Sequence, residues 1–110
     1  MIALVDAINS CKAELPKPEV YPLRENVAAI SVGVVEGIPV ADLDYPMDFA
    51  AAVDMNVVMT GTGQFVEIQG TGEESTFTED ELASLLKLAK SGISELTQIQ
   101  EAALGDDWPF

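Results

Sequence analysis

The stretch VADLDYPMDFAAAVDMNVVM, residues 40–59, decides the fold because it joins two predicted hairpins. Its first residues continue an apolar strand that is predicted to end at Tyr45. A second strand is predicted to leave from Asp54. Between the two strands, Pro46 and the small-residue run Ala50–Ala52 predict a short irregular turn. The turn therefore sets how the two halves of the sheet meet.

Three carboxylates in this stretch form its most unusual chemical feature. Asp42 and Asp44 are predicted to share one face of the strand, because side chains alternate along extended chain. Asp48 lies just past the strand end and is placed to turn back toward them. Two carboxylates about 4 Å apart repel by about 1 kcal/mol in water and about 4 kcal/mol at an intermediate effective dielectric. Such a cluster needs solvent, a shared proton or a cation, and on pattern alone solvated carboxylates are the more common case.

Outward from this stretch, the pattern predicts two hairpins. Glu36-Gly37 favours a tight two-residue turn, and the loop Gly61-Thr62-Gly63 supplies the positive φ that such connections require. Met55 and Met59 are predicted core residues because they follow period-two spacing, which places both side chains on one face of the strand. The four predicted strands are Val27–Val34, Ile38–Tyr45, Asp54–Thr60 and Gln64–Gln69.

Helices are predicted at both ends of the chain. Met1–Leu15 has helical apolar spacing without a capping residue ahead of it, and Pro16–Asn26 is a proline-rich connector. Thr78 and Glu81 fit a capping box at the start of a second helical region. Gly92 marks either close packing or a break there, so this region is one long helix or two shorter ones. The predicted fold is α+β: a four-stranded, largely antiparallel sheet packed by an N-terminal helix and one or two C-terminal helices.

Composition limits the classes of function. The chain has 110 residues, 48% of them hydrophobic, and we expect one domain over 1–110. It has no histidine and one cysteine, Cys11, which excludes histidine-based catalysis and an internal disulfide. No apolar run is long enough for a membrane helix, so we expect a soluble, cytoplasmic protein. The net charge of −14 repels phosphate backbones, so RNA binding would need basic surface from elsewhere.

Five features of the sequence belong together: DLDY at 42–45, Asp48, DMNVVMTGTGQFVEIQGTGEE at 54–74, the FTEDEL helix start and the closing QEAALGD. Together they resemble the C-terminal half of the bacterial ribonuclease PH family. Milder similarity, in VAAISVGVV and ALVDAI, extends the resemblance over nearly the whole chain. The resemblance implies a single ribonuclease PH C-terminal-type domain, with the N-terminal half of the family absent.

The resemblance also implies an activity, which is phosphate-dependent 3′→5′ exoribonuclease trimming of tRNA 3′ ends with release of nucleoside diphosphates. Inorganic phosphate is the co-substrate, and a divalent cation, usually Mg²⁺, is the cofactor. The two active-site aspartates of the family match Asp42 and Asp48, which are expected to be both the catalytic and the metal-binding residues. Family members form hexameric rings, so we expect a homo-oligomer or a partner chain. RNA binding is expected only with a complementary basic half.

Some residues depart from the family pattern. Phe49 and the following Ala50–Val53 stand where Ser-Ala-Ala-Glu-Thr is common, and Pro46 and Met47 stand where acidic residues are common. These departures support an alternative, a structural fragment or ring-type subunit that keeps the fold without activity. A third hypothesis is a folded fragment of a longer protein. For Asp44 the pattern favours a structural role, and for Asp54 a turn or strand start.

Overall fold

The computed structural model describes the backbone of residues 1–110 and every side chain except that of Asp48. Four antiparallel strands form one sheet in the order β2-β1-β3-β4. The elements are α1 (Ile2–Ser10), β1 (Val27–Val35), β2 (Ile38–Ala41), α2 (Tyr45–Ala50), β3 (Val53–Thr60), β4 (Phe65–Gly72) and α3 (Glu79–Leu104), with short 3₁₀ turns at Lys12–Glu14 and Gly105–Asp107. The predicted α+β fold of two hairpins with terminal helices is confirmed.

Both hairpins have the turns that their glycines predict. β1 and β2 are joined by Glu36 and Gly37, which have φ values of 52° and 76°. Positive φ values at both positions give a two-residue turn that matches the right-handed twist of the flanking strands. The β3–β4 loop places Gly63 at φ 85°. Its Gly61 leaves no room for a Cβ atom because the Asn26 side chain lies against it. β1 and β3 pair over eight residues, which joins the two hairpins into one sheet.

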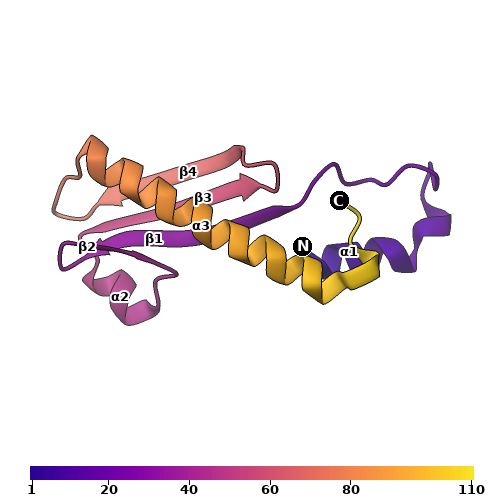
Figure 1. Cartoon of the computed structure of the whole chain (residues 1–110), viewed down its shortest axis with the longest axis horizontal. Coiled ribbons are helices and arrows are strands. Elements are labelled where there is room, and N and C mark those ends of the chain that lie inside the picture. Colours follow the sequence, from indigo (N-terminus) through magenta and orange to yellow (C-terminus); the bar gives the residue numbers. More distant parts are fainter.

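Helix α3 covers one face of the sheet and then runs past its end (Figure 1). The capping box is present: Thr78 accepts a hydrogen bond from the Glu81 amide, and the Glu81 carboxylate accepts one from the Thr78 amide. The helix is continuous through Gly92, where a Cβ atom would collide with Ile30 of β1. Gly92 therefore marks close packing, and there is one C-terminal helix instead of two.

The core lies between α3 and the sheet. Its members are apolar residues of β1, β3 and the middle of α3, namely Ala28, Val32, Val34, Val53, Met55, Val57, Met59, Leu85, Ala89 and Ile93. Met55 and Met59 are each 1% exposed, which confirms them as core residues. By contrast, α3 does not cover β4 in this way, and seven of the eight residues of β4 are exposed.

Helix α1 is shorter than predicted, because it ends at Ser10 instead of Leu15. Ser10 Oγ and Cys11 Sγ both donate to the Ala7 carbonyl, which competes with continuation of the helix. Its start at Met1 has no side-chain cap, as the sequence predicted. α1 packs against the far part of α3, and the rings of Tyr21, Trp108 and Phe110 form an aromatic cluster at this end of the molecule.

The molecule is elongated, with extents of 52 × 24 × 19 Å and a radius of gyration of 17.0 Å. A compact domain of this length would have a radius of gyration of about 13 Å. Figure 1 shows why: the sheet with α2 forms one end, and α1 with the chain termini forms the other. No helix that the structure describes is both long and apolar enough to cross a membrane.

Candidate active site at the end of strand β2

The candidate site begins where β2 stops. The strand ends at Ala41, so the prediction that it continues to Tyr45 was wrong. Asp42 has a φ of 57°, a left-handed conformation that Asp tolerates better than most residues. Its amide donates to the Ser31 carbonyl at 2.7 Å, which holds it beside β1. The reversal at Asp42 takes the chain out of the sheet.

The segment that follows is a helix, where the sequence pattern predicted an irregular turn. Asp44 caps it: its Oδ1 atom accepts a hydrogen bond from the Met47 amide at 2.9 Å, a typical contact between an N-cap carboxylate and the first turn. Pro46 fits there because the first turn of a helix needs no donor at that position. Asp44 therefore has a structural role as the cap of α2. Asp42 and Asp44 do not share a strand face, so that prediction was wrong.

Helix α2 is fixed to the sheet at both of its ends. Leu43 lies over Gly33 of β1, with Cδ1 2.9 Å from the place a Cβ atom would take. Ala51 is 6% exposed, and the Ala52 amide donates to the Val34 carbonyl at 2.9 Å. These contacts set the position of the α2 backbone relative to Asp42.

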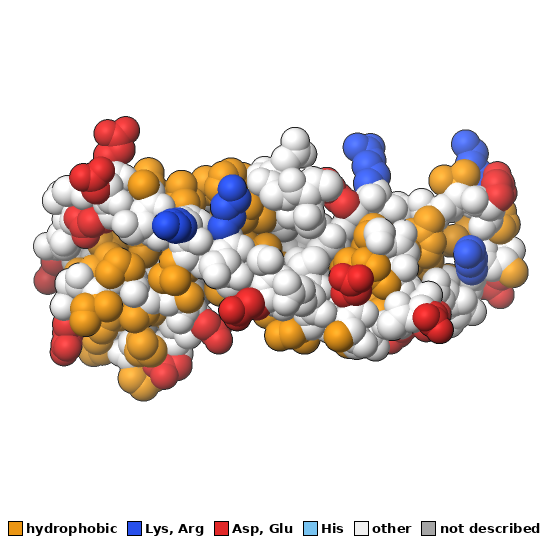
Figure 2. Space-filling view, viewed as in Figure 1, with side chains coloured by type: hydrophobic (Ala, Val, Ile, Leu, Met, Phe, Trp, Pro, Cys, Tyr) orange, Lys and Arg blue, Asp and Glu red, His pale blue; other side chains and the backbone are white. Residues whose placement is uncertain are grey.

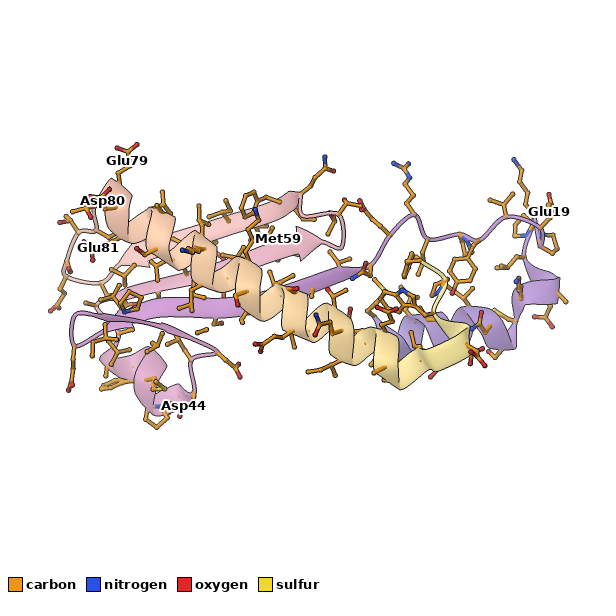
Figure 3. All side chains as sticks on the ribbon, viewed as in Figure 1. Glu19, Asp44, Met59, Glu79, Asp80 and Glu81 are labelled. Atoms are coloured by element: carbon orange, nitrogen blue, oxygen red, sulfur yellow. The ribbon has the colours of Figure 1, made fainter. Side chains whose placement is uncertain are left out.

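Of the two aspartates expected to act together, the structure places one completely. The side chain of Asp42 is exposed at the end of β2. Asp48 belongs to α2, but its side chain lies outside the described residues. In Figure 3, Asp44 lies at the lower edge of α2, whereas Glu79, Asp80 and Glu81 surround the start of α3. The acids near α2 therefore form a group separate from those of the α3 first turn.

A polar pair beside Asp42 was not singled out by the sequence reasoning. Ser31 Oγ donates to Asn56 Oδ1 at 2.9 Å across β1 and β3. Asp54, two residues before Asn56 in β3, lies on the same face, since residues two apart in a strand share a face. The strand begins at Val53, one residue before the predicted start at Asp54. The period-two spacing of Asp54 and Asn56 was the available signal. Strand pairing, which aligns Asn56 with Ser31, was needed to find the contact.

The described part of the chain offers few groups for a metal ion. Among residues whose side chains are described, no three His, Cys, Asp or Glu side chains cluster closely enough to hold one. A site at α2 would thus rest on Asp42 with Asp48 and on oxygen atoms from water or substrate, an arrangement that Mg²⁺ commonly adopts. A hollow of about 330 Å³ lies elsewhere, between the β3–β4 loop and α3, and it contains neither aspartate.

Comparison with known proteins defines the class. The model for the 3′ exoribonuclease family, domain 2, matches residues 25–92, which include the whole sheet and α2. The chain therefore belongs to the 3′ exoribonuclease family.

Within that family the chain is similar to bacterial ribonuclease PH. It is 56% identical to the ribonuclease PH of Listeria innocua over 106 residues, which are 96% of this chain and 42% of that protein. It is also 56% identical to the ribonuclease PH of Rhodopirellula baltica over 108 residues, covering 94% and 44% of the two chains. The resemblance seen in the sequence motifs is confirmed, and the chain spans less than half the length of these relatives.

Two solved structures share the fold. Rice (Oryza sativa) Rrp46 superimposes with a TM-score of 0.66 at 21% identity, covering 89% of this chain and 46% of that one. An Archaeoglobus fulgidus exosome with RNA bound to the active site gives a TM-score of 0.61 at 13% identity, covering 76% and 35%.

Proposed function

We propose that this chain supplies the active-site carboxylates of a phosphate-dependent 3′→5′ exoribonuclease that trims tRNA 3′ ends in the cytoplasm. The observation that carries the proposal is the family match over residues 25–92, which includes the segment from Asp42 to Asp48. The proposed roles belong to these two residues because both lie where the chain leaves the sheet and enters α2.

In the proposed reaction, an oxygen of inorganic phosphate attacks the phosphorus of the last phosphodiester bond. The bond to the 3′ oxygen breaks, and that oxygen takes up a proton as a nucleoside diphosphate leaves. One carboxyl of the pair Asp42 and Asp48, in its protonated form, donates this proton. The other carboxylate would hold the divalent cation. Mg²⁺, when bound, would offset the negative charge that develops on the phosphate oxygens.

The chain alone is proposed to be inactive and to need a complementary basic part, the N-terminal half of the family. With a net charge of −14 it repels RNA, whose binding depends on Lys and Arg. In Figure 2 the few basic side chains are spread along the molecule, and none of those visible lies over α2. The elongated shape and the exposed β4 also favour assembly with further copies or a partner chain.

Reconstitution tests this proposal. The chain is mixed with the N-terminal part of Listeria innocua ribonuclease PH, and release of nucleoside diphosphate from a short 3′-labelled RNA is measured with and without inorganic phosphate. We expect phosphate-dependent release only in the mixture, and its loss in Asp42→Asn and in Asp48→Asn.

The matched control is Asp80→Asn, which removes an exposed carboxylate in the first turn of α3, at a distance from α2 (Figure 3). It should leave the release rate unchanged. Full phosphorolysis by the Asp42→Asn, Asp48→Asn double variant would overturn the assignment of both residues.

The second candidate function is a structural module that keeps the fold without activity. It is favoured by the apolar run from Phe49 to Val53, where polar residues are common in the family, and by the net charge of −14. In that case the reconstituted mixture would assemble without releasing nucleoside diphosphate, and divalent metal would leave the α2 region unchanged.

A further inference from the structure

Two aromatic side chains on α2 are far more exposed than the other large apolar side chains of the chain. Tyr45 is 81% exposed and Phe49 is 84% exposed, and the next is Ile38 at 62%. Burying a ring of this size contributes about 1.5–3 kcal/mol, so leaving two in water forfeits a large stabilisation. Figure 2 shows apolar atoms protruding at the lower left, over α2, with acidic side chains beside them.

The position of these rings follows from how α2 is fixed. Leu43 and Ala51 hold the two ends of α2 against the sheet, and Asp44 caps it. Tyr45 and Phe49 are four residues apart, so they lie on the same side of the helix, about one turn from each other. Among the described residues neither ring packs against another aromatic ring. The helix therefore presents two ring faces to solvent together.

The size and surroundings of the pair favour a small planar ligand. Two aromatic side chains bury about 300–500 Å² together, well below the roughly 800 Å² per partner of a stable protein interface. The exposed carboxylates of Asp42 and Asp44, which directly precede Tyr45 in the chain, disfavour an acidic ligand held by charge alone. A nucleobase is neutral and flat, and it stacks on aromatic rings whatever its sequence.

We propose that Tyr45 and Phe49 form a stacking platform for the base of the RNA nucleotide that is cleaved. This inference rests on the proposed function, because Asp48 lies between Tyr45 and Phe49 in the sequence of α2 and the base is covalently tied to the reacting phosphate. With a rise of 1.5 Å per residue, a base on these rings lies within one helical turn of the Asp48 backbone. The platform would bind the base without using any positive charge.

The test is a titration of the 110-residue chain with adenosine 5′-monophosphate in millimolar Mg²⁺, followed by NMR of the aromatic ring protons. Ribose 5-phosphate, which has the same sugar and phosphate but no base, is the matched ligand control. We expect upfield shifts of the Tyr45 and Phe49 ring signals with the nucleotide only. We also expect Phe49→Leu, which keeps an apolar side chain, to weaken binding at least about fivefold.

The matched protein control is Ile99→Ala, which removes an exposed apolar side chain of α3 and should leave binding unchanged. Equal shifts with ribose 5-phosphate, or unchanged affinity in Phe49→Leu, would overturn the platform. Ring shifts that follow protein dilution without nucleotide would instead assign the rings to contacts between copies, and would also overturn it. The titration involves no phosphorolysis, so it tests the platform separately from the proposed function. If the ring signals do not shift with nucleotide but the reconstituted mixture is active, the platform is refuted and the proposed function is not.

Discussion

Leu43 lies directly over Gly33, with its Cδ1 atom 2.9 Å from the position that a Cβ atom on Gly33 would occupy. The same Cβ atom would collide with the Val53 carbonyl oxygen of β3. The glycine thus lets three segments meet closely: β1, the start of β3 and the loop that carries Asp42. This contact couples the packing of the sheet to the geometry of the candidate site.

Gly33→Ala is therefore expected to lower the free energy of unfolding by about 1–3 kcal/mol through overpacking. Urea denaturation followed by circular dichroism measures the change. Ala29→Ser, at an exposed position of the same strand, is the control and should change the midpoint little. A Gly33→Ala midpoint equal to that of the wild type would show that Leu43 and β3 move aside at no cost.

Removing the cap of α3 is expected to destabilise the chain. Thr78→Ala deletes the hydroxyl that accepts from the Glu81 amide, and loss of such a cap costs about 1 kcal/mol. Thr78→Ser keeps the acceptor and should restore most of the stability. Thermal denaturation of the two variants under identical conditions makes the comparison. Equal stability of the alanine and serine variants would mean that the capping box contributes nothing.

Asn26 ties the β3–β4 hairpin to α3. It is 4% exposed, and its side-chain Nδ2 atom donates to Thr97 Oγ1 at 3.2 Å. Its backbone carbonyl accepts a hydrogen bond from the Gly61 amide at 3.0 Å. Thr97→Val leaves the buried amide without that acceptor, which is expected to cost about 1–3 kcal/mol. Hydrogen exchange at the β3–β4 loop and the urea midpoint both measure the effect.

Ser94→Ala, at an exposed position one turn earlier in α3, is the control for the Asn26 contact. It should leave hydrogen exchange in the loop unchanged. Thr97→Val with wild-type protection at Gly61 and a wild-type midpoint would contradict the role assigned to the contact.

Stability is expected to fall at alkaline pH because of Tyr21. Burial of its hydroxyl, with further repulsion from Asp107 and then Asp6, raises the pKa of Tyr21 above the ordinary value of 10.0. The folded state thus favours the neutral phenol, and the free energy of unfolding is undiminished below pH 10. The free energy of unfolding then falls progressively as the pH rises from 10 through the raised pKa of Tyr21.

Tyr21→Phe removes this titration and should flatten the alkaline part of the profile. The Tyr21 hydroxyl has no hydrogen-bond partner among the described residues, so its loss breaks no bond. Urea midpoints between pH 8 and pH 11 measure the difference. A profile of Tyr21→Phe that is as steep as that of the wild type would contradict this assignment.

The sequence predicted the sheet, the turn glycines and the α3 cap because each depends on local chemistry. Glu36-Gly37 fixes its own turn, and Thr78 with Glu81 caps its own helix. It missed α2 because a six-residue helix has too few residues for a helical period to be read. The Asp44 cap was its one local signal, and Pro46 with the alanine run suggested a turn instead.

The arrangement of the candidate site depended on contacts far apart in the sequence, and these have no local signature. The pairing of Ser31 with Asn56 needed the register of β1 and β3. The exposure of Tyr45 and Phe49 depends on which side of α2 faces the sheet, and Leu43 over Gly33 helps to set that. Asp42 and Asp48 were selected as candidate site residues by resemblance to a family, since their spacing alone also suits solvated carboxylates.

The most direct test of the central claim is the binding of a divalent cation at α2. Mn²⁺, added at micromolar amounts to the ¹⁵N-labelled chain, broadens amide signals close to its binding site. We predict selective broadening at residues 42–49 that is lost in Asp42→Asn, with the acidic first turn of α3, Glu79 to Glu81, as the internal reference. Broadening confined to 79–81, or identical broadening at 42–49 in wild type and Asp42→Asn, would contradict the claim.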